Sequence, residues 1–103
     1  MAAMQRLFQL MSDKKASDIF ITTGAPINIK INGTAMPINQ QMMTPDIIRG
    51  LLLEVLTEAQ FNELEEKLEL NCNYGMEGIG NFRLSAFHQK GSPALVVRFI
   101  PAE

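Results

Sequence analysis

The spacing of hydrophobic residues changes along this chain, and each change marks an expected element. In residues 3–15 the apolar side chains recur every three or four positions, which predicts a helix with one buried stripe. From Ile27 to Asn32, isoleucines alternate with polar residues, the two-residue period of a half-buried strand. The helical stripe consists of Met4, Leu7, Phe8 and Met11.

Three strands are expected after this helix. The first is the compact apolar run in Asp18–Thr23, and the second is the alternating segment from Ile27. Asn32-Gly33 is a strong hairpin signal because both residues tolerate the positive φ angles of a type I′ turn. The third strand is Thr34–Ile38, and its Pro37 cannot donate to a ladder, so this strand should lie at an edge or contain a bulge.

Two helices should follow. Thr44-Pro45-Asp46 is a helix start, with a capping threonine and a proline in the first turn. Thr57–Gln60 has the pattern of a capping box and begins a shorter helix. The first helix has a broad apolar face of Ile47, Ile48, Leu51, Leu52, Val55 and Leu56, and the second is expected to bury Phe61, Leu64 and Leu68.

The last third of the chain returns to strands. We expect weak pairing at Cys72–Tyr74, a glycine-rich turn at Gly75–Gly80, and a hairpin over residues 82–100 that packs on the helix containing Leu52. The resulting fold class is α+β, with a mainly antiparallel sheet and flanking helices, in a single domain over residues 1–103. The end of the chain, Phe99–Glu103, has a proline break and is typical of a boundary inside a longer protein.

Composition narrows the function only coarsely. The net charge of −2 and the pI near 5.4 argue against a nucleic-acid partner. The single cysteine, Cys72, cannot form an internal disulfide, which favours a reducing, cytoplasmic setting. No run approaches the roughly 20 apolar residues of a membrane span, and the N-terminus lacks the pattern of a secretory signal.

Few residues offer chemistry. The segment Gly75–Gly80 lacks the lysine and hydroxyl of a phosphate-binding loop, so no catalytic site is expected in this chain alone. His88 and Cys72 lack the spacing of metal ligands, so no metal site is expected. We expect His88 to be structural or at the surface, and Cys72 to act as a small buried hydrophobe.

Two arginines remain as candidates. Arg83 and Arg98 lie in successive strands, and two interpretations are open. Each could form an ordinary surface ion pair. Alternatively, the hairpin could hold both guanidinium groups toward an anion, a role that suits arginine because its planar fork grips phosphate oxygens and stays charged.

Two blocks of the sequence resemble a known family. Ala16-Ser17-Asp18-Ile19-Phe20-Ile21 with Gly24-Ala25-Pro26 and Lys30-Ile31-Asn32-Gly33 resembles the N-terminal signature of type II secretion and type IV pilus ATPases. Gly78–Phe87 followed by Arg98-Phe99-Ile100-Pro101 resembles the later block of the same family. Phe20 stands where the principal retraction motors usually carry histidine, so the resemblance is closer to the accessory, PilU type.

The resemblance implies a PAS-like N-terminal domain of a hexameric pilus-retraction ATPase that drives twitching motility. Its RecA-like motor domain, which would hold ATP and Mg, is absent from this chain, so the chain alone should carry no cofactor. In the family the domain closes over nucleotide, and Arg83 and Arg98 match the arginines that reach the terminal phosphates. Asp18 matches a signature residue whose expected role is structural, capping backbone donors at a strand edge.

The same resemblance implies the partners. They are the motor domains of its own and neighbouring subunits in a homo-hexamer, a paralogous retraction motor, and the pilus platform at the cytoplasmic face of the inner membrane. Two alternatives stay open: a PAS-like sensor with a ligand in its own core, which needs a cavity of about 300 Å³ or more, and a protein-interaction adaptor, which needs an exposed apolar patch.

Overall fold

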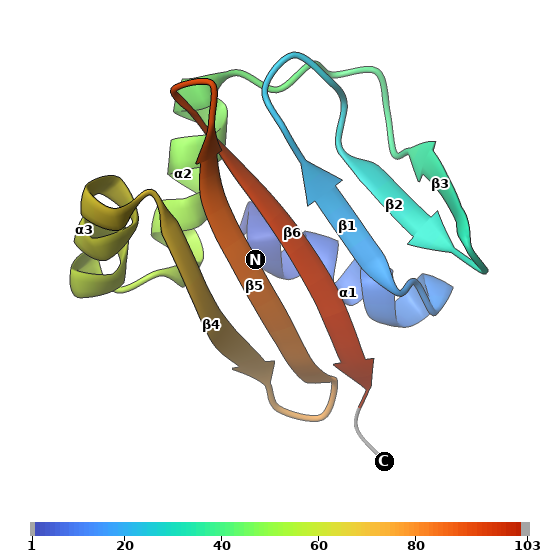
Figure 1. The fold of residues 1–103 in the computed structure, drawn as a ribbon. Coiled ribbons are helices and arrows are strands. Elements are labelled where there is room, and N and C mark those ends of the chain that lie inside the picture. The colour runs from blue at the N-terminus through green and yellow to red at the C-terminus, as the bar shows by residue number, and fades with distance from the viewer. Residues whose placement is uncertain (1, 102–103) are drawn as a thin grey trace.

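The computed structural model describes residues 2–101, so Ala102 and Glu103 of the expected boundary lie outside the described residues. Within that range, three helices accompany one six-stranded sheet with the strand order β3-β2-β1-β6-β5-β4 (Figure 1). The elements are α1 (Ala3–Lys14), β1 (Asp18–Ile21), β2 (Asn28–Ile31), β3 (Thr34–Pro37), α2 (Pro45–Val55), α3 (Glu58–Lys67), β4 (Glu69–Met76), β5 (Gly80–Gln89) and β6 (Ser92–Pro101).

Every neighbouring pair of strands in the sheet is antiparallel, which confirms the α+β class with a mainly antiparallel sheet. β3, with its Pro37, is an edge strand as predicted. Asn32 and Gly33 have φ angles of 51° and 80°, as the predicted turn between β2 and β3 requires.

The helix starts follow the predicted capping chemistry. The hydroxyl of Thr44 accepts a hydrogen bond from the backbone N–H of Ile47 at 3.2 Å. The side chains of Thr57 and Gln60 complete a reciprocal capping box at the start of α3. These caps satisfy backbone donors that have no partner inside the helix, and so they fix where each helix begins.

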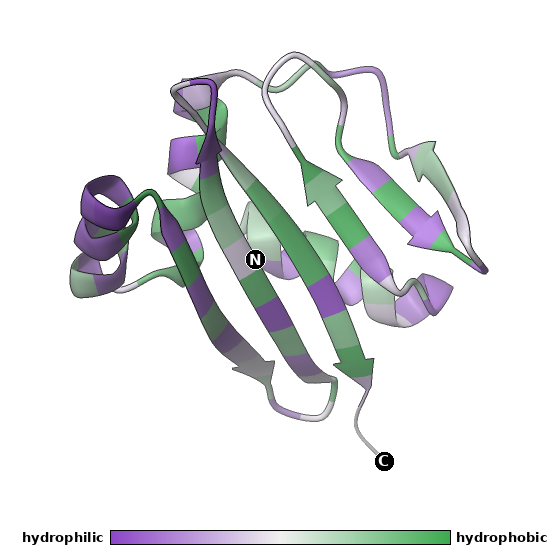
Figure 2. Ribbon diagram, viewed as in Figure 1, coloured by the Kyte–Doolittle hydropathy of each residue, from purple (hydrophilic) through white to green (hydrophobic). Residues whose placement is uncertain are grey.

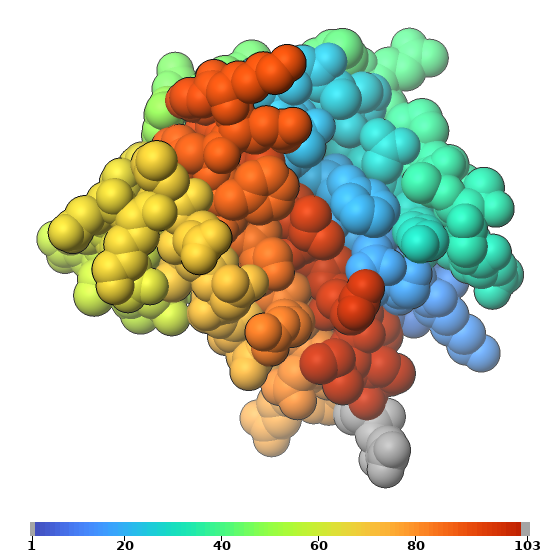
Figure 3. Space-filling view, in the orientation of Figure 1, coloured from blue at the N-terminus to red at the C-terminus, as the bar shows by residue number. Residues whose placement is uncertain are grey.

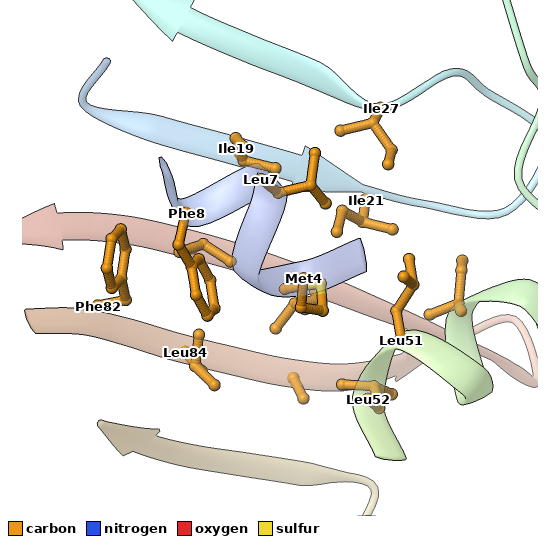
Figure 4. Close-up of a cluster of buried hydrophobic side chains, with 14 of the residues drawn as sticks. Met4, Leu7, Phe8, Ile19, Ile21, Ile27, Leu51, Leu52, Phe82 and Leu84 are labelled. Atoms are coloured by element: carbon orange, nitrogen blue, oxygen red, sulfur yellow. The ribbon is translucent and has the colours of Figure 1, made fainter. Parts of the chain in front are cut away.

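The core lies between the sheet and the helices α1 and α2. Figure 4 shows Met4 and Phe8 of α1 among side chains from the strands and α2, including Leu52 and Phe82. Leu52 is fully buried, and α2 packs against β6, as predicted for the helix beneath the hairpin. Hydrophobic and hydrophilic residues alternate along β5 (Figure 2), so every second side chain of this strand points away from the core.

Three predictions in the second half need correction. The segment expected to pair weakly at Cys72–Tyr74 belongs to β4, which pairs with β5 from Glu69 to Met76. Gly75 and Gly80 therefore lie in strands, and the turn between them is shorter than predicted. Leu68 was predicted to be buried but is 54% exposed, because it has φ 66° at the end of α3 and the chain turns away there.

Candidate functional site

One face of the sheet is open. In Figure 1 the helices α1 and α2 lie behind the sheet, and α3 lies beside β4. Figure 3, in the same orientation, shows the face of the sheet that is turned away from α1 and α2, where the strands reach the surface without a covering helix. On β5, Phe82, Leu84 and Ala86 are buried in the core, so the intervening Arg83 and Ser85 point to the open face.

The backbone beneath the candidate arginines is held by aromatic packing. Phe82 precedes Arg83 in the sequence, and Phe99 follows Arg98. The two phenylalanines are register partners across the β5–β6 ladder. Their rings stack at a centroid distance of 4.9 Å, and Phe82 also stacks on Phe8 of α1 at 4.2 Å. This stack ties the hairpin to α1 on the core side and leaves the arginines on the other side.

Arg83 and Arg98 are direct partners in the register of β5 and β6. The structure thus brings the two predicted site residues together on the open face. Like charges directly opposite one another in a sheet are destabilising. The arrangement therefore needs a compensating group or a function that uses both charges.

Asp18 supplies that compensation. It is the register partner of Arg98 across the β1–β6 ladder, and its Oδ1 accepts a hydrogen bond from Nε of Arg98 at 3.3 Å. Its side chain is only 9% exposed, whereas that of Arg98 is 71% exposed. The predicted capping of backbone donors is therefore wrong: the hydrogen bond found at this carboxylate comes from the Arg98 side chain.

Arg83, Arg98 and Asp18 belong to one row of residues that crosses the sheet and also contains Lys30. From β4 to β2 the register places Asn73, Arg83, Arg98, Asp18 and Lys30 side by side. Sequence reasoning missed the contact between Asp18 and Arg98, because it depends on the pairing of the first strand with the last. Local patterns carry no signal for such a pairing.

A shallow depression opens beside the arginine pair. It has a volume of about 210 Å³ and is lined by Asp18, Arg83, Ser85, Val96 and Arg98. This volume lies below the roughly 300–1,000 Å³ of pockets that hold a whole small ligand. The site can therefore contact one charged end of a ligand whose remainder is bound elsewhere.

The other two candidates, His88 and Cys72, lie where they contribute to packing and to contacts between elements. The Nε2 atom of His88 lies 2.8 Å from Oε2 of Glu65 without the alignment of a hydrogen bond, and Arg49 Nε lies 3.7 Å from the other oxygen of Glu65. These contacts join β5 to α3 and α2. Burial raises the pKa of the Cys72 thiol, which makes it a poor nucleophile at neutral pH. Residues 2–101 hold no group of three or more His, Cys, Asp or Glu side chains that could bind a metal ion.

Two hollows of more than 300 Å³ lie elsewhere on the surface. One, of about 380 Å³, is at the β5–β6 turn and includes Gln89 and Lys90. The other, of about 520 Å³, lies between the end of α1 and the end of β6, and includes Lys15 and Pro101. Both include exposed residues in their lining. Neither is a cavity within the core.

No helix in the described part of the chain is long and apolar enough to cross a membrane; the longest, α1, has 12 residues.

Comparisons with known proteins agree with this fold. No protein-family model matches the chain. The type IV pilus ATPase PilU of Pseudomonas aeruginosa is 38% identical over 96 residues, which are 93% of this chain and 25% of that protein. The type IV pilus retraction ATPase PilT of the same organism is 27% identical over 97 residues, 94% of this chain and 28% of that protein.

Solved structures give the same result. The pilus retraction motor PilT with bound ADP matches with a TM-score of 0.88 and 30% identity, over 100% of this chain and 30% of that one. The ATPase DotB of Legionella pneumophila matches with a TM-score of 0.79 over 96% of this chain and 28% of that one, and its 21% identity supports the fold alone.

The fold is thus that of a domain found in type IV pilus ATPases. More specifically, the chain is an N-terminal domain of the PilT/PilU type of pilus-retraction ATPase. Its identity is higher to PilU than to PilT, in agreement with the prediction made from Phe20. The chain spans about a quarter of the length of the P. aeruginosa relatives.

Proposed function

We propose that this chain is the regulatory and assembly domain of a hexameric pilus-retraction ATPase, in which it closes over ATP bound by a motor domain. Arg83 and Arg98 then contact the terminal phosphates. The observation that supports this role is the direct pairing of the two arginines on an open sheet face. Guanidinium groups delivered across an interface stabilise the charge of a transferring phosphoryl group.

The remaining parts of the site would come from the motor domain. The depression beside the arginines is too small for a nucleotide, and it contains Asp18 as its only carboxylate, so it offers no pair of acidic ligands for Mg. The arginine side of the site fits phosphate oxygens, whereas the base, the ribose and the metal need other ligands. The isolated chain is accordingly expected neither to bind ATP tightly nor to hydrolyse it.

The proposed assembly places the open face against a motor domain of the same or a neighbouring subunit. The hexamer would work at the cytoplasmic face of the inner membrane, together with a paralogous retraction motor and the pilus platform, to drive twitching motility. A face with two arginines and no covering helix suits a contact that must form and release with nucleotide, because exposed charges are solvated again when it opens.

The two alternatives have less support. A ligand sensor needs an internal cavity, and the hollows formed by residues 2–101 open at the surface. An adaptor needs one continuous apolar patch. The large exposed hydrophobic residues among those described instead stand on separate segments: Met36, Met42, Leu53, Leu68 and Ile100.

The test uses the full-length protein with Arg83→Ala, Arg98→Ala and both together. Each variant should stay folded, while ATP turnover and retraction fall. Arginines supplied across an interface can be worth about 10³–10⁵ in rate, and we expect a smaller loss per single variant because one can partly replace the other. Lysine should rescue poorly, since it lacks the planar fork.

Arg6→Ala is the matched control. Arg6 is an exposed arginine on α1, behind the sheet, so its removal changes the net charge equally without touching the open face. Melting temperature and ATPase rate are measured on the same preparations. Normal turnover in the Arg83/Arg98 double alanine variant would end the phosphate-contact proposal.

A further inference from the structure

We infer that Asp18 is the positioning residue of this site: it orients Arg98 so that the terminal nitrogens of the guanidinium group face the phosphates. The inference rests on the proposed function of the arginine pair and goes further, because it assigns different tasks to the two arginines. Asp18 itself does not contact the nucleotide.

The placement of Asp18 is fixed by backbone pairing on both sides. It is the register partner of Lys30 on β2 and of Arg98 on β6. β1 and β6 are the two central strands of the sheet, so neither can shift without breaking ladders on both sides. The Asp18 carboxylate is the buried partner of the ion pair, with its side chain 9% exposed, whereas the Arg98 side chain extends into solvent and is 71% exposed.

The atom that Asp18 engages leaves the rest of the group free. A guanidinium carries N–H donors on Nε and on both terminal nitrogens. Asp18 Oδ1 accepts the hydrogen bond from Nε at 3.3 Å, so the terminal donors of Arg98 remain available to an anion. A side chain oriented before binding loses less conformational entropy when the ligand arrives.

Arg83 is different. Within residues 2–101 it makes no ion pair and no side-chain hydrogen bond, although it stands directly opposite Arg98. Arg98 is thus held in one direction, while Arg83 is free to follow the phosphates. Together with Asp18 the pair keeps a net positive charge, since two guanidinium groups face one carboxylate.

This division of roles predicts a particular kinetic signature. Asp18→Asn removes a negative charge near the phosphates, so ATP binding should not weaken and KM should stay the same or fall. The hydrogen bond that orients Arg98 weakens, however, because a neutral amide oxygen accepts less strongly than a carboxylate. The value of kcat should therefore fall by roughly three- to tenfold, less than the hundredfold that a displaced catalytic group can cost. Asp18→Glu restores a carboxylate and should recover part of kcat.

The experiment compares Asp18→Asn with Asp13→Asn in the full-length protein. Asp13 is an exposed carboxylate on α1 and serves as the matched control. In the 103-residue chain itself, the NMR signal of the Arg98 Nε–H group should exchange with water faster in Asp18→Asn than in the unchanged chain. This readout depends on the contact alone and not on ATP hydrolysis.

The outcomes separate this inference from the proposed function. If Arg98→Ala slows turnover but Asp18→Asn does not, the positioning role is wrong and the phosphate role stands. If the double arginine variant turns over normally, the proposed function fails first. A lower melting temperature with unchanged turnover per folded molecule would make Asp18 merely structural.

A second variant keeps the test decisive if Asp18→Asn does not fold. Arg98→Lys retains a positive charge to pair with Asp18 but has no separate Nε and terminal nitrogens. It should therefore keep the melting temperature and lose turnover nearly as much as Arg98→Ala. Full turnover in Arg98→Lys would overturn the inference.

Discussion

The Nε atom of Arg98 lies 3.3 Å from Oδ1 of Asp18, on the strand that pairs with β6 on the side away from Arg83. Arg98 is therefore attracted to its neighbour on β1, while its neighbour on β5 carries a like charge. The two arginines of the candidate site should consequently differ in what they contribute to stability, even though both serve the same proposed function.

Arg98→Ala should lower the free energy of unfolding, because it leaves the buried carboxylate of Asp18 without its partner. We expect a loss of about 0.2–1 kcal/mol, since the arginine is mostly exposed and solvent screens the pair. Arg83→Ala should change stability little, or raise it slightly, because it removes a like-charged cross-strand neighbour. Urea unfolding of both variants, with Asp18→Ala to complete a double-mutant cycle, measures the difference. Equal effects would contradict the assigned ion pair.

The core prediction concerns two adjacent leucines on α2. Leu52 is fully buried, whereas Leu53 is 57% exposed. Leu52→Ala should cost about 2–5 kcal/mol because it leaves a cavity under β6. Leu53→Ala, the same substitution one position later, should stay within about 0.5 kcal/mol of the unchanged chain. Denaturant unfolding checks both, and similar losses would mean that the helix face is wrongly assigned.

Much of the fold could be predicted from local patterns. The helical stripe of α1, the Asn32-Gly33 turn and the caps at Thr44 and Thr57 all depend on residues close in sequence. Their physical causes, namely burial of one helix face, tolerance of positive φ and satisfaction of backbone donors, act within a few positions.

The parts that local patterns could not supply depend on distant partners. β4 is regular because β5 pairs with all of it, and its own sequence, with Asn71, Asn73 and Gly75, gives weak strand signals. Likewise, the family resemblance drew attention to Arg83 and Arg98, but their direct opposition follows from the register of the hairpin. The partner of Asp18 lies 80 positions along the chain.

The wrongly predicted Leu68 leads to a stability prediction. It occupies a left-handed conformation at the end of α3, and its side chain is mostly exposed. A residue with a Cβ atom lowers stability by about 1–2 kcal/mol in this conformation. Glycine avoids that cost but lowers stability by about 0.5–1 kcal/mol, because it loses more conformational entropy on folding. Leu68→Gly should therefore stabilise the domain by about 0.5–1 kcal/mol, measurable as a higher melting temperature.

Leu68→Ala is the control for this change. Alanine removes the exposed apolar atoms as glycine does but keeps the Cβ atom that causes the strain. It should give little or no stabilisation. If alanine and glycine raise the melting temperature equally, exposed hydrophobic surface and not backbone conformation limits stability at this position.

The last prediction follows from the raised pKa of the Cys72 thiol. Burial disfavours the thiolate, so the folded chain holds this proton to higher pH than the unfolded chain, whose thiol should titrate near pH 8.5. Where the folded state binds more protons, stability falls as pH rises. The contribution of the Cys72 thiol to folding stability is thus fully present below about pH 8. It is lost as the pH rises from the unfolded pKa through the folded pKa.

Cys72→Ala isolates this effect, because the substitution removes the titrating group and leaves the other charges in place. Between about pH 7 and 10 the unchanged chain should therefore lose more stability than the variant. Alkylation by iodoacetamide at pH 8 should also be slower in the folded chain than in urea, since the thiolate is the reacting form. Parallel stability curves, or equally fast alkylation in both states, would mean that the Cys72 side chain is solvated in the folded protein.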